Sequence, residues 1–460
     1  MNDQQRSGLS RRNFLKTNTL GGAALLAHQN AHAVPATGKK PNILYIITDQ
    51  QHIQALSAHG CPYVQTPNMD RLVEQGTSFL ESYSTNPVCS PARSSLFTGR
   101  TTCETSVITN GEGIRPDIPN VGQWMKPRGY ETIFCGKWHI PGSWTYDIPG
   151  FTVLPGGTGG KGTLGDQTIS RSCEGYLRNR SGSDPFLLVA TFLQPHDVCN
   201  FTSRFSEKSE VPDYPEIMDN LPPVPDNFEF DGKEPKGARL NRRKVASWTK
   251  LHWQYYLWSY YRMVEEVDAE IGRILNALDD TGEADNTVII LTSDHGEGCG
   301  SHQMILKNTL YDESAKVPLV VSWPGNMREN IRDTEHLVSG LDIMATICDY
   351  ADVPSPPKTR GRSLRPLLEN NADAWQDFVV TEVLHDTGRM IRTNDYKLIA
   401  FRDDPVRQLF DMKNDPGETR NLIDDSSVAS VYVDLKKTLD EWEAHLDHAP
   451  NALPPFRVEG

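Results

Sequence analysis

The chain has 460 residues, which predicts either two packed units or one large α/β unit with a smaller appendage. Its formal net charge of −14 argues against a general nucleic-acid-binding protein and against a basic membrane-surface protein. No apolar run is long enough to cross a bilayer, so we predict no membrane span. The eight cysteines are too few for a disulfide-stabilised scaffold.

The N-terminus has the pattern of an export signal. Arg11-Arg12 forms a twin-arginine pattern, a short apolar stretch covers residues 20–27, and Ala31-His32-Ala33 is a small-x-small cleavage site. The alternative is a frayed basic tail, which needs no such order of features. We therefore predict a twin-arginine signal peptide over residues 1–33, folded export by the Tat machinery, and a periplasmic or secreted protein.

Short apolar runs alternate with helical patterns in the next part of the chain. The runs predict buried strands, of the parallel kind, at residues 43–48, 131–135, 186–192, 287–292 and 317–322. The clearest helical pattern covers residues 245–278, and residues 203–243 are predicted to form a long irregular insertion. This alternation predicts an α/β fold, with a large, doubly wound, mixed but mostly parallel sheet between layers of helices.

The pattern changes after about residue 370. Short strands joined by polar turns are predicted at residues 378–383, 389–393, 396–401 and 408–411, followed by a helix near residues 427–445. We therefore expect a catalytic α/β domain over residues 34–370 and a smaller C-terminal domain of antiparallel sheet plus helix over residues 371–460.

Ionisable side chains follow four of the five predicted strands of the larger domain. In chain order they are Asp49, which the neutral Gln50 follows, then Lys137 and His139, His196, and Asp294 and His295. Each of these groups alone is typical of an ordinary turn. Ligand sites in open α/β sheets lie at the carboxyl ends of the strands, so the set as a whole predicts a metal-centred hydrolytic site.

The segment Cys89-Ser90-Pro91-Ala92-Arg93 is the strongest local signal. Ser90 can cap a helix and Pro91 suits its first turn, which places Cys89 at a helix N-terminus, where the dipole favours anions. Arg93 can face the same point. The residues leave open a buried structural cysteine and a thiolate nucleophile of lowered pKa. A cysteine phosphatase would need its arginine further along the chain.

The same segment, together with residues 94–100, resembles the signature of the type I, formylglycine-dependent sulfatases of the alkaline phosphatase superfamily. Other segments follow in the order of that family, at residues 41–49, 66–72, 136–139, 195–196, 293–297 and 307–314, and then 396–399 and 409–422. The resemblance covers residues 41–425 and is to exported bacterial carbohydrate sulfatases.

The resemblance implies that Cys89 is oxidised to formylglycine, with Pro91 and Arg93 recognised by the formylglycine-generating maturation enzyme. The aldehyde hydrates to a diol, of which one oxygen attacks sulfur and the other lets the sulfated intermediate collapse. It also implies one Ca²⁺, held by Asp49, Gln50, Asp294 and the modified Cys89. His295 stands where the family often has an oxygen ligand, so it is a further candidate ligand and leaves the identity of the metal open.

The resemblance assigns the remaining site residues to charge stabilisation and proton transfer. Arg93 and Lys137 would stabilise the modified residue, and His139 would accept a proton when sulfate leaves. His196 and Lys307 would bind sulfate oxygens, with His196 as the acid for the leaving alcohol. His302 is a candidate substrate contact. Taken singly, such residues are more often surface lysines or structural histidines.

The resemblance predicts hydrolysis of a sulfate ester, with a sulfated carbohydrate as substrate. Two alternatives stay open. A phosphodiesterase or phosphonate monoester hydrolase of the same superfamily shares the fold and the acid–histidine metal pair, which Gln50 and His295 would suit. An inactive sulfated-glycan-binding pseudoenzyme is the other, and it requires that Cys89 is never oxidised.

Overall fold

The computed structural model describes residues 39–141, 146–156, 161–204, 214–229, 232–239, 241–371 and 374–458. The predicted signal peptide lies outside these residues. In the described part of the chain, no helix combines the length and the hydropathy needed to cross a membrane.

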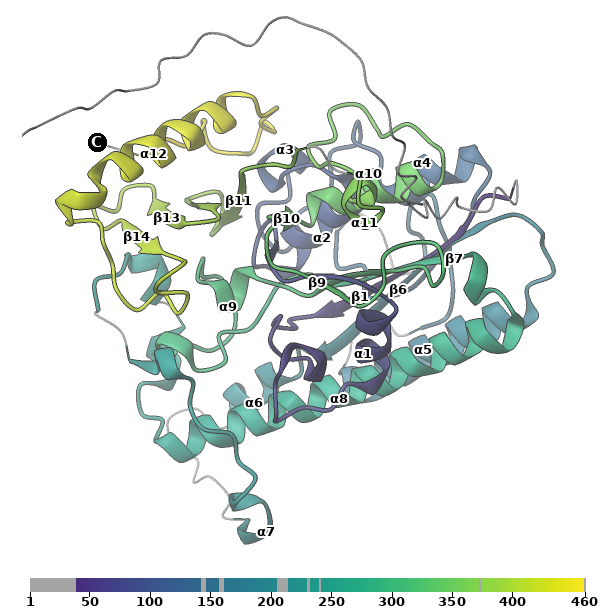
Figure 1. Ribbon diagram of the computed structural model, residues 1–460, viewed down its shortest axis with the longest axis horizontal. Coiled ribbons are helices and arrows are strands. Elements are labelled where there is room, and N and C mark those ends of the chain that lie inside the picture. The colour runs from purple at the N-terminus through teal and green to yellow at the C-terminus, as the bar shows by residue number, and fades with distance from the viewer. Residues whose placement is uncertain are drawn as a thin grey trace, which may run out of the picture. The chain divides into compact units, whose positions relative to one another are not determined.

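An eight-stranded sheet forms the centre of the larger part of the fold (Figure 1). Its order is β5 (Thr152–Val153), β4 (Glu131–Gly136), β6 (Phe186–Pro195), β1 (Asn42–Asp49), β7 (Thr287–Ser293), β8 (Leu319–Ser322), β2 (Gly76–Phe79) and β9 (Ile331–Asp333). β1 pairs in parallel with β6 and β7, so that Tyr45 stands between Val189 and Ile290. The predicted mixed, mostly parallel sheet is confirmed.

The predicted direction of one strand was wrong. β8 corresponds to the run at residues 317–322, but it pairs antiparallel with both β7 and β2. Its carboxyl end therefore lies at the opposite edge of the sheet from the ends of β1, β4, β6 and β7. Trp323, Pro324 and Gly325 follow it directly, in place of the ionisable side chains found after the other four strands.

Helices cover both faces of the sheet, because alternate residues of the buried strand β1 face opposite sides. Leu44 and Ile46 pack with α1 (Pro67–Glu74), α5 (Gly162–Asn179) and α8 (Lys250–Thr281). Ile43, Tyr45 and Ile47 pack with α2 (Cys89–Thr98), α4 (Val121–Met125), α10 (Leu341–Tyr350) and α11 (Arg365–Leu368). Figure 1 shows α5 and α8 on one side of the strands and α2 and α10 on the other.

The long helix α8 starts later than predicted. Residues 242–245 form a separate 3₁₀ turn, and α8 begins after Thr249, whose side chain and that of His252 form a reciprocal cap. Helix α5 was missed, because glycines and polar residues hide its apolar positions Ile169, Cys173 and Leu177.

The predicted C-terminal strands, their antiparallel pairing and the helix after them are confirmed. β11 (Phe378–Val383), β12 (Gly388–Thr393), β13 (Tyr396–Phe401) and β14 (Gln408–Asp411) form an antiparallel sheet in chain order. Helix α12 (Ala429–Ala444) packs Leu435 and Leu439 against Ile391 and Leu398 of that sheet. The remaining short elements are β3 (Ser82–Tyr83), β10 (Val338–Ser339), α3 (Thr102–Thr105), α6 (Val198–Arg204), α7 (Pro215–Met218) and α9 (Asp312–Ala315).

Candidate active site

Four parallel strands deliver the predicted side chains to one edge of the sheet. Asp49 is the last residue of β1, and Asp294 directly follows β7. Lys137 follows β4, and His196 follows β6. The turn after β4 depends on Gly136, whose φ is +106° and where a Cβ atom would lie 1.9 Å from the Thr191 carbonyl oxygen.

Cys89 is the first residue of α2, as predicted, but the helix is not capped as predicted. The residue before the helix is Val88, and no side chain caps it. The Ser90 hydroxyl instead donates a hydrogen bond to the carbonyl oxygen of His139. This contact ties the start of α2 to the loop after β4.

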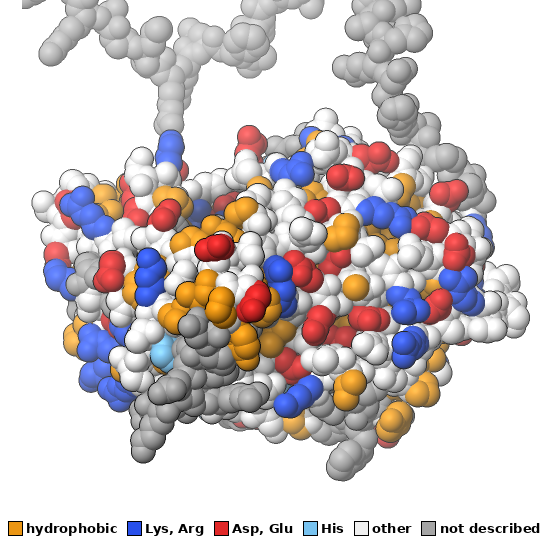
Figure 2. Space-filling model, turned by 90° about the horizontal axis from the view of Figure 1, so that it is seen from below, with side chains coloured by type: hydrophobic (Ala, Val, Ile, Leu, Met, Phe, Trp, Pro, Cys, Tyr) orange, Lys and Arg blue, Asp and Glu red, His pale blue; other side chains and the backbone are white. Residues whose placement is uncertain are grey.

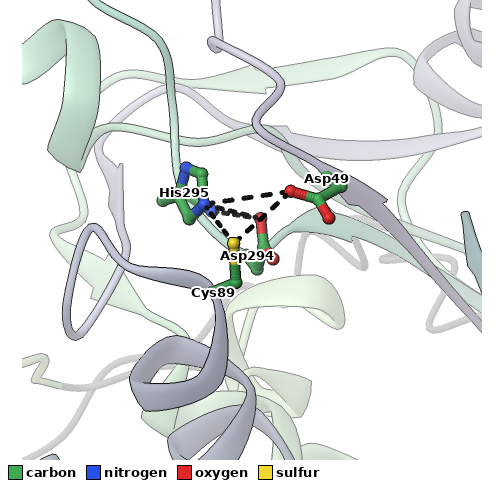
Figure 3. Close-up of side chains that lie close together, drawn as sticks. All are labelled: Asp49, Cys89, Asp294 and His295. Atoms are coloured by element: carbon green, nitrogen blue, oxygen red, sulfur yellow. Dashed lines mark hydrogen bonds and ion pairs between the residues drawn. The ribbon is translucent and has the colours of Figure 1, made fainter. Parts of the chain in front are cut away.

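Asp49, Cys89, Asp294 and His295 face one another in a buried cluster (Figure 3). The Cys89 Sγ lies 3.3 Å from His295 Nε2 and 3.8 Å from Asp49 Oδ1. His295 Nε2 lies 3.5 Å from Asp294 Oδ1. The other ring nitrogen, Nδ1, lies 2.9 Å from the Gly296 carbonyl oxygen, which can only accept, so a neutral ring presents its Nε2 lone pair to the cluster.

Three cationic side chains surround this cluster. The Lys307 Nζ donates to Cys89 Sγ and to Gln50 Oε1, both at 2.9 Å. Lys137 pairs with Asp49. Arg93, which is completely buried, donates to Asp294 Oδ2 at 2.9 Å and to the Lys137 carbonyl oxygen at 2.6 Å. Its Nη2 has no hydrogen-bond partner among the described residues and lies 3.6 Å from Asp49.

The charges of the cluster shift its pKa values. Burial raises the pKa of the Cys89 thiol, but Lys137, Lys307 and His295 outweigh burial and hold that pKa well below its ordinary value. Burial and Cys89 raise the pKa of Asp49, but Lys137, His196 and Arg93 lower it to about 2 overall. The site therefore favours negative charge at both positions.

The three predicted histidines other than His295 lie in two different places. His139 is exposed and its side chain hydrogen-bonds to Cys89, and half-buried His196 lies close enough for its charge to act on Asp49. His302 lies elsewhere. It is only 1% exposed, stacks on the Tyr311 ring at 4.1 Å, and its Nε2 lies 3.1 Å from the Glu418 carbonyl oxygen. This placement gives no support for His302 as a substrate contact.

Glu297 is a site residue that the sequence analysis did not assign. It is completely buried, and its Oε2 accepts a 2.5 Å hydrogen bond from Gln50 Nε2. Its Oε1 accepts from the Tyr256 hydroxyl and from the Leu306 backbone N–H. Because a carboxylate only accepts, Glu297 turns the Gln50 amide so that Oε1 faces Lys307. Its place within the Ser-Asp-His-Gly-Glu segment was the available signal.

The donor set of the cluster fits a divalent cation. Asp49, Asp294 and Gln50 offer oxygens, which hard cations such as Ca²⁺ prefer, and His295 adds a nitrogen more typical of transition-metal sites. A modified Cys89 would replace the one soft ligand by oxygen. The four-residue cluster could therefore hold one metal ion, mostly through oxygen.

Comparisons with known proteins show the family of this chain. The model of the family described as Sulfatase matches residues 41–353, and a model described as N-sulphoglucosamine sulphohydrolase, C-terminal, matches residues 300–445. The chain belongs to the sulfatase family. This membership confirms the predicted class of enzyme, the sulfuric ester hydrolases, and the superfamily resemblance.

The sulfatase chain has relatives and structural neighbours over most of its length. It is 27% identical over 438 residues to a Delta 4,5-hexuronate-2-O-sulfatase of Bacteroides thetaiotaomicron, covering 88% of this chain and 89% of the relative. It superposes on a 2-O GAG sulfatase with a TM-score of 0.79 and 25% identity, over 92% and 98% of the two chains. A phosphonate monoester hydrolase of Agrobacterium radiobacter shares the fold, with a TM-score of 0.74 and 24% identity over 88% and 96%.

The orientation of Gln50 in this sulfatase is predicted to depend on Glu297. In a Glu297→Gln variant, the new amide keeps its oxygen at the Oε1 position, where the Leu306 N–H donates, and places its nitrogen at the Oε2 position. The Gln50 amide must then flip, so that its Nε2 and not its Oε1 faces Lys307. We expect about ten- to hundredfold lower turnover of an aryl sulfate, because a buried donor is left unsatisfied.

The matched control is Tyr256→Phe, which removes one donor from the other oxygen of Glu297 and leaves the contact with Gln50. This variant should keep turnover within about threefold of the parent. Equal activity of both variants, or a crystal structure of Glu297→Gln with an unflipped Gln50, would contradict the assigned role.

Proposed function

We propose that this protein hydrolyses sulfate esters of a sulfated carbohydrate, using a formylglycine formed from Cys89 and one bound Ca²⁺. The observation that carries the proposal is the position of Cys89 at the start of α2, in contact with Lys307 and beside two buried carboxylates. The formylglycine would supply a hydrated aldehyde as nucleophile, and the metal would lower the pKa of that hydrate.

The roles of the surrounding residues follow from their contacts. Asp49, Gln50, Asp294 and His295 would hold the metal. Arg93, Lys137 and Lys307 would offset the negative charge that develops on the sulfate, in a buried setting where electrostatic stabilisation is strong. His139 contacts Cys89 and would take a proton there, while His196 would protonate the leaving alcohol.

The substrate class is supported by the relatives, which include a hexuronate-2-O-sulfatase and a 2-O GAG sulfatase. The twin-arginine pattern at residues 1–33 supports export by the Tat machinery to the periplasm or beyond. The further partner is the formylglycine-generating enzyme, which would act on the segment from Cys89 to Arg93.

Oxidation of Cys89 gives the most direct prediction. Mass spectrometry of the peptide carrying Cys89, from protein made together with the maturation enzyme, should show the mass of the aldehyde. Cys89→Ser and Cys89→Ala should lose essentially all turnover and keep the circular-dichroism spectrum and melting temperature of a folded protein. A peptide with intact cysteine from an inactive protein would favour a glycan-binding role instead.

A phosphonate monoester or phosphate diester hydrolase is the second candidate. His295 favours it, because its Nε2 faces the cluster as a metal ligand would. We nevertheless expect a higher kcat/KM for an aryl sulfate than for the matching aryl phosphate monoester, phosphate diester and phosphonate ester. A preference for the diester or the phosphonate would overturn the sulfatase proposal.

Removal of divalent metal is expected to abolish turnover, because no metal would then lower the pKa of the hydrate at position 89. Ca²⁺ should restore the activity of the wild type and raise its melting temperature. The rise in melting temperature on adding Ca²⁺ should be smaller in Asp294→Asn. The control is Asp117→Asn, an exposed aspartate paired with Arg115. Restoration by Mn²⁺ or Zn²⁺ but not by Ca²⁺ would contradict the Ca²⁺ proposal.

A further inference from the structure

Positive charge is concentrated in one short part of this acidic chain. Residues 233–250 contain one acidic residue, Glu234, and seven basic residues, which are Lys233, Lys236, Arg239, Arg242, Arg243, Lys244 and Lys250. The whole chain, by contrast, has a net charge of −14. Such a local excess is the electrostatic footprint of a polyanionic partner.

Three of these cations lie exposed at the start of α8 and have no acidic partner. Arg243, Lys244 and Lys250 are exposed, and among the described residues none forms an ion pair. Within the described part of the chain, the one hydrogen bond of the Lys244 Nζ is donated to the Asn241 side-chain oxygen, at 3.4 Å. Arg242 differs, because it pairs with the buried Glu234. We call Arg243, Lys244 and Lys250 the basic edge.

The basic edge adjoins the segment that carries Lys307. The Asn241 amide nitrogen donates to the Lys307 carbonyl oxygen, and Arg242 donates to the His302 carbonyl oxygen at 2.8 Å. Lys307 in turn contacts Cys89. Successive Cα atoms are about 3.8 Å apart. The Cα atom of Arg243 therefore lies within about 8 Å of the Asn241 Cα atom, and the Cα atom of Lys244 lies within about 11 Å of it.

The basic edge is held in place by buried neighbours. Val245 and Trp248 are buried, and the Trp248 ring lies 4.9 Å from that of Trp253. Lys250 stands in the first turn of α8, which contains no acidic residue, although a helix dipole disfavours a cation there. Figure 2 shows Lys and Arg side chains gathered at the lower left, the end of the view at which α8 starts in Figure 1.

We propose that Arg243, Lys244 and Lys250 bind additional sulfate groups of a polysulfated glycan whose reacting sulfate lies at Cys89. This inference rests on the proposed function and specifies its substrate as a multiply charged chain. Single exposed cations contribute little binding free energy, but several matched to several sulfates add up and respond to salt.

The test compares the variant Arg243→Gln/Lys244→Gln/Lys250→Gln with a control that loses the same charge, Lys126→Gln/Lys413→Gln/Lys437→Gln. The control residues are exposed and lie before β4, after β14 and on α12. Binding of a dextran sulfate oligosaccharide in 50 mM salt (chosen so that screening is weak) should be about tenfold weaker in the first variant and within twofold in the control.

A second measurement separates this inference from the proposed function. Turnover of a small aryl monosulfate should be the same in both variants, whereas KM for a polysulfated oligosaccharide should rise about tenfold only in the first. A wild type that turns over neither sulfate ester would refute the proposed function. The binding of dextran sulfate by the two variants would still test the basic edge in that case. The inference would be overturned if both variants lost dextran sulfate binding equally. It would also be overturned if the wild type bound single-stranded DNA as strongly as dextran sulfate.

Discussion

Two buried carboxylates, Asp49 and Asp294, are the constraint on which the rest of the site depends. Parallel pairing of β1 with β7 brings them to the same edge of the sheet, and neither is more than 1% exposed. Two anions in such a setting are unfavourable without cations. The buried Arg93 contacts both, and removing one partner of such a buried pair typically costs about 3–5 kcal/mol.

The C-terminal sheet stabilises the segment that brings the third cation, Lys307, to this edge. Glu418 accepts from the Asp312 backbone N–H at 2.7 Å, and Lys397 of β13 pairs with both Asp312 and Glu418. At the other end of the segment, His302 contacts the Glu418 carbonyl oxygen. His302 and Asp312 are thus both held by contacts to Glu418, and this fixes the ends of the segment that carries Lys307.

The same arrangement explains what the sequence could and could not predict. Asp49, Lys137, His196 and Asp294 were predictable, because each lies within four residues of the end of a predicted apolar run and parallel strands share one edge. The position of His302 was not predictable, because its neighbours Tyr311 and Glu418 come from distant parts of the chain, and no local pattern encodes how those parts pack. Glu297 is a similar case, since its partner Gln50 is 247 residues away. The direction of β8 also depends on pairing and not on its own residues.

The net charge of the chain does not by itself decide whether the site attracts an anion, and electrostatics explains why. In physiological salt, charges more than about 8 Å apart across solvent are largely screened, whereas buried pairs are screened much less. An anion at Cys89 therefore responds to Lys307, Lys137 and Arg93, and only weakly to acidic side chains spread over the surface. Arg93 and Lys137 are already matched by Asp294 and Asp49, so a bound metal ion would leave the site with a surplus of positive charge. That local surplus, and not the total of −14, decides whether a sulfate is attracted.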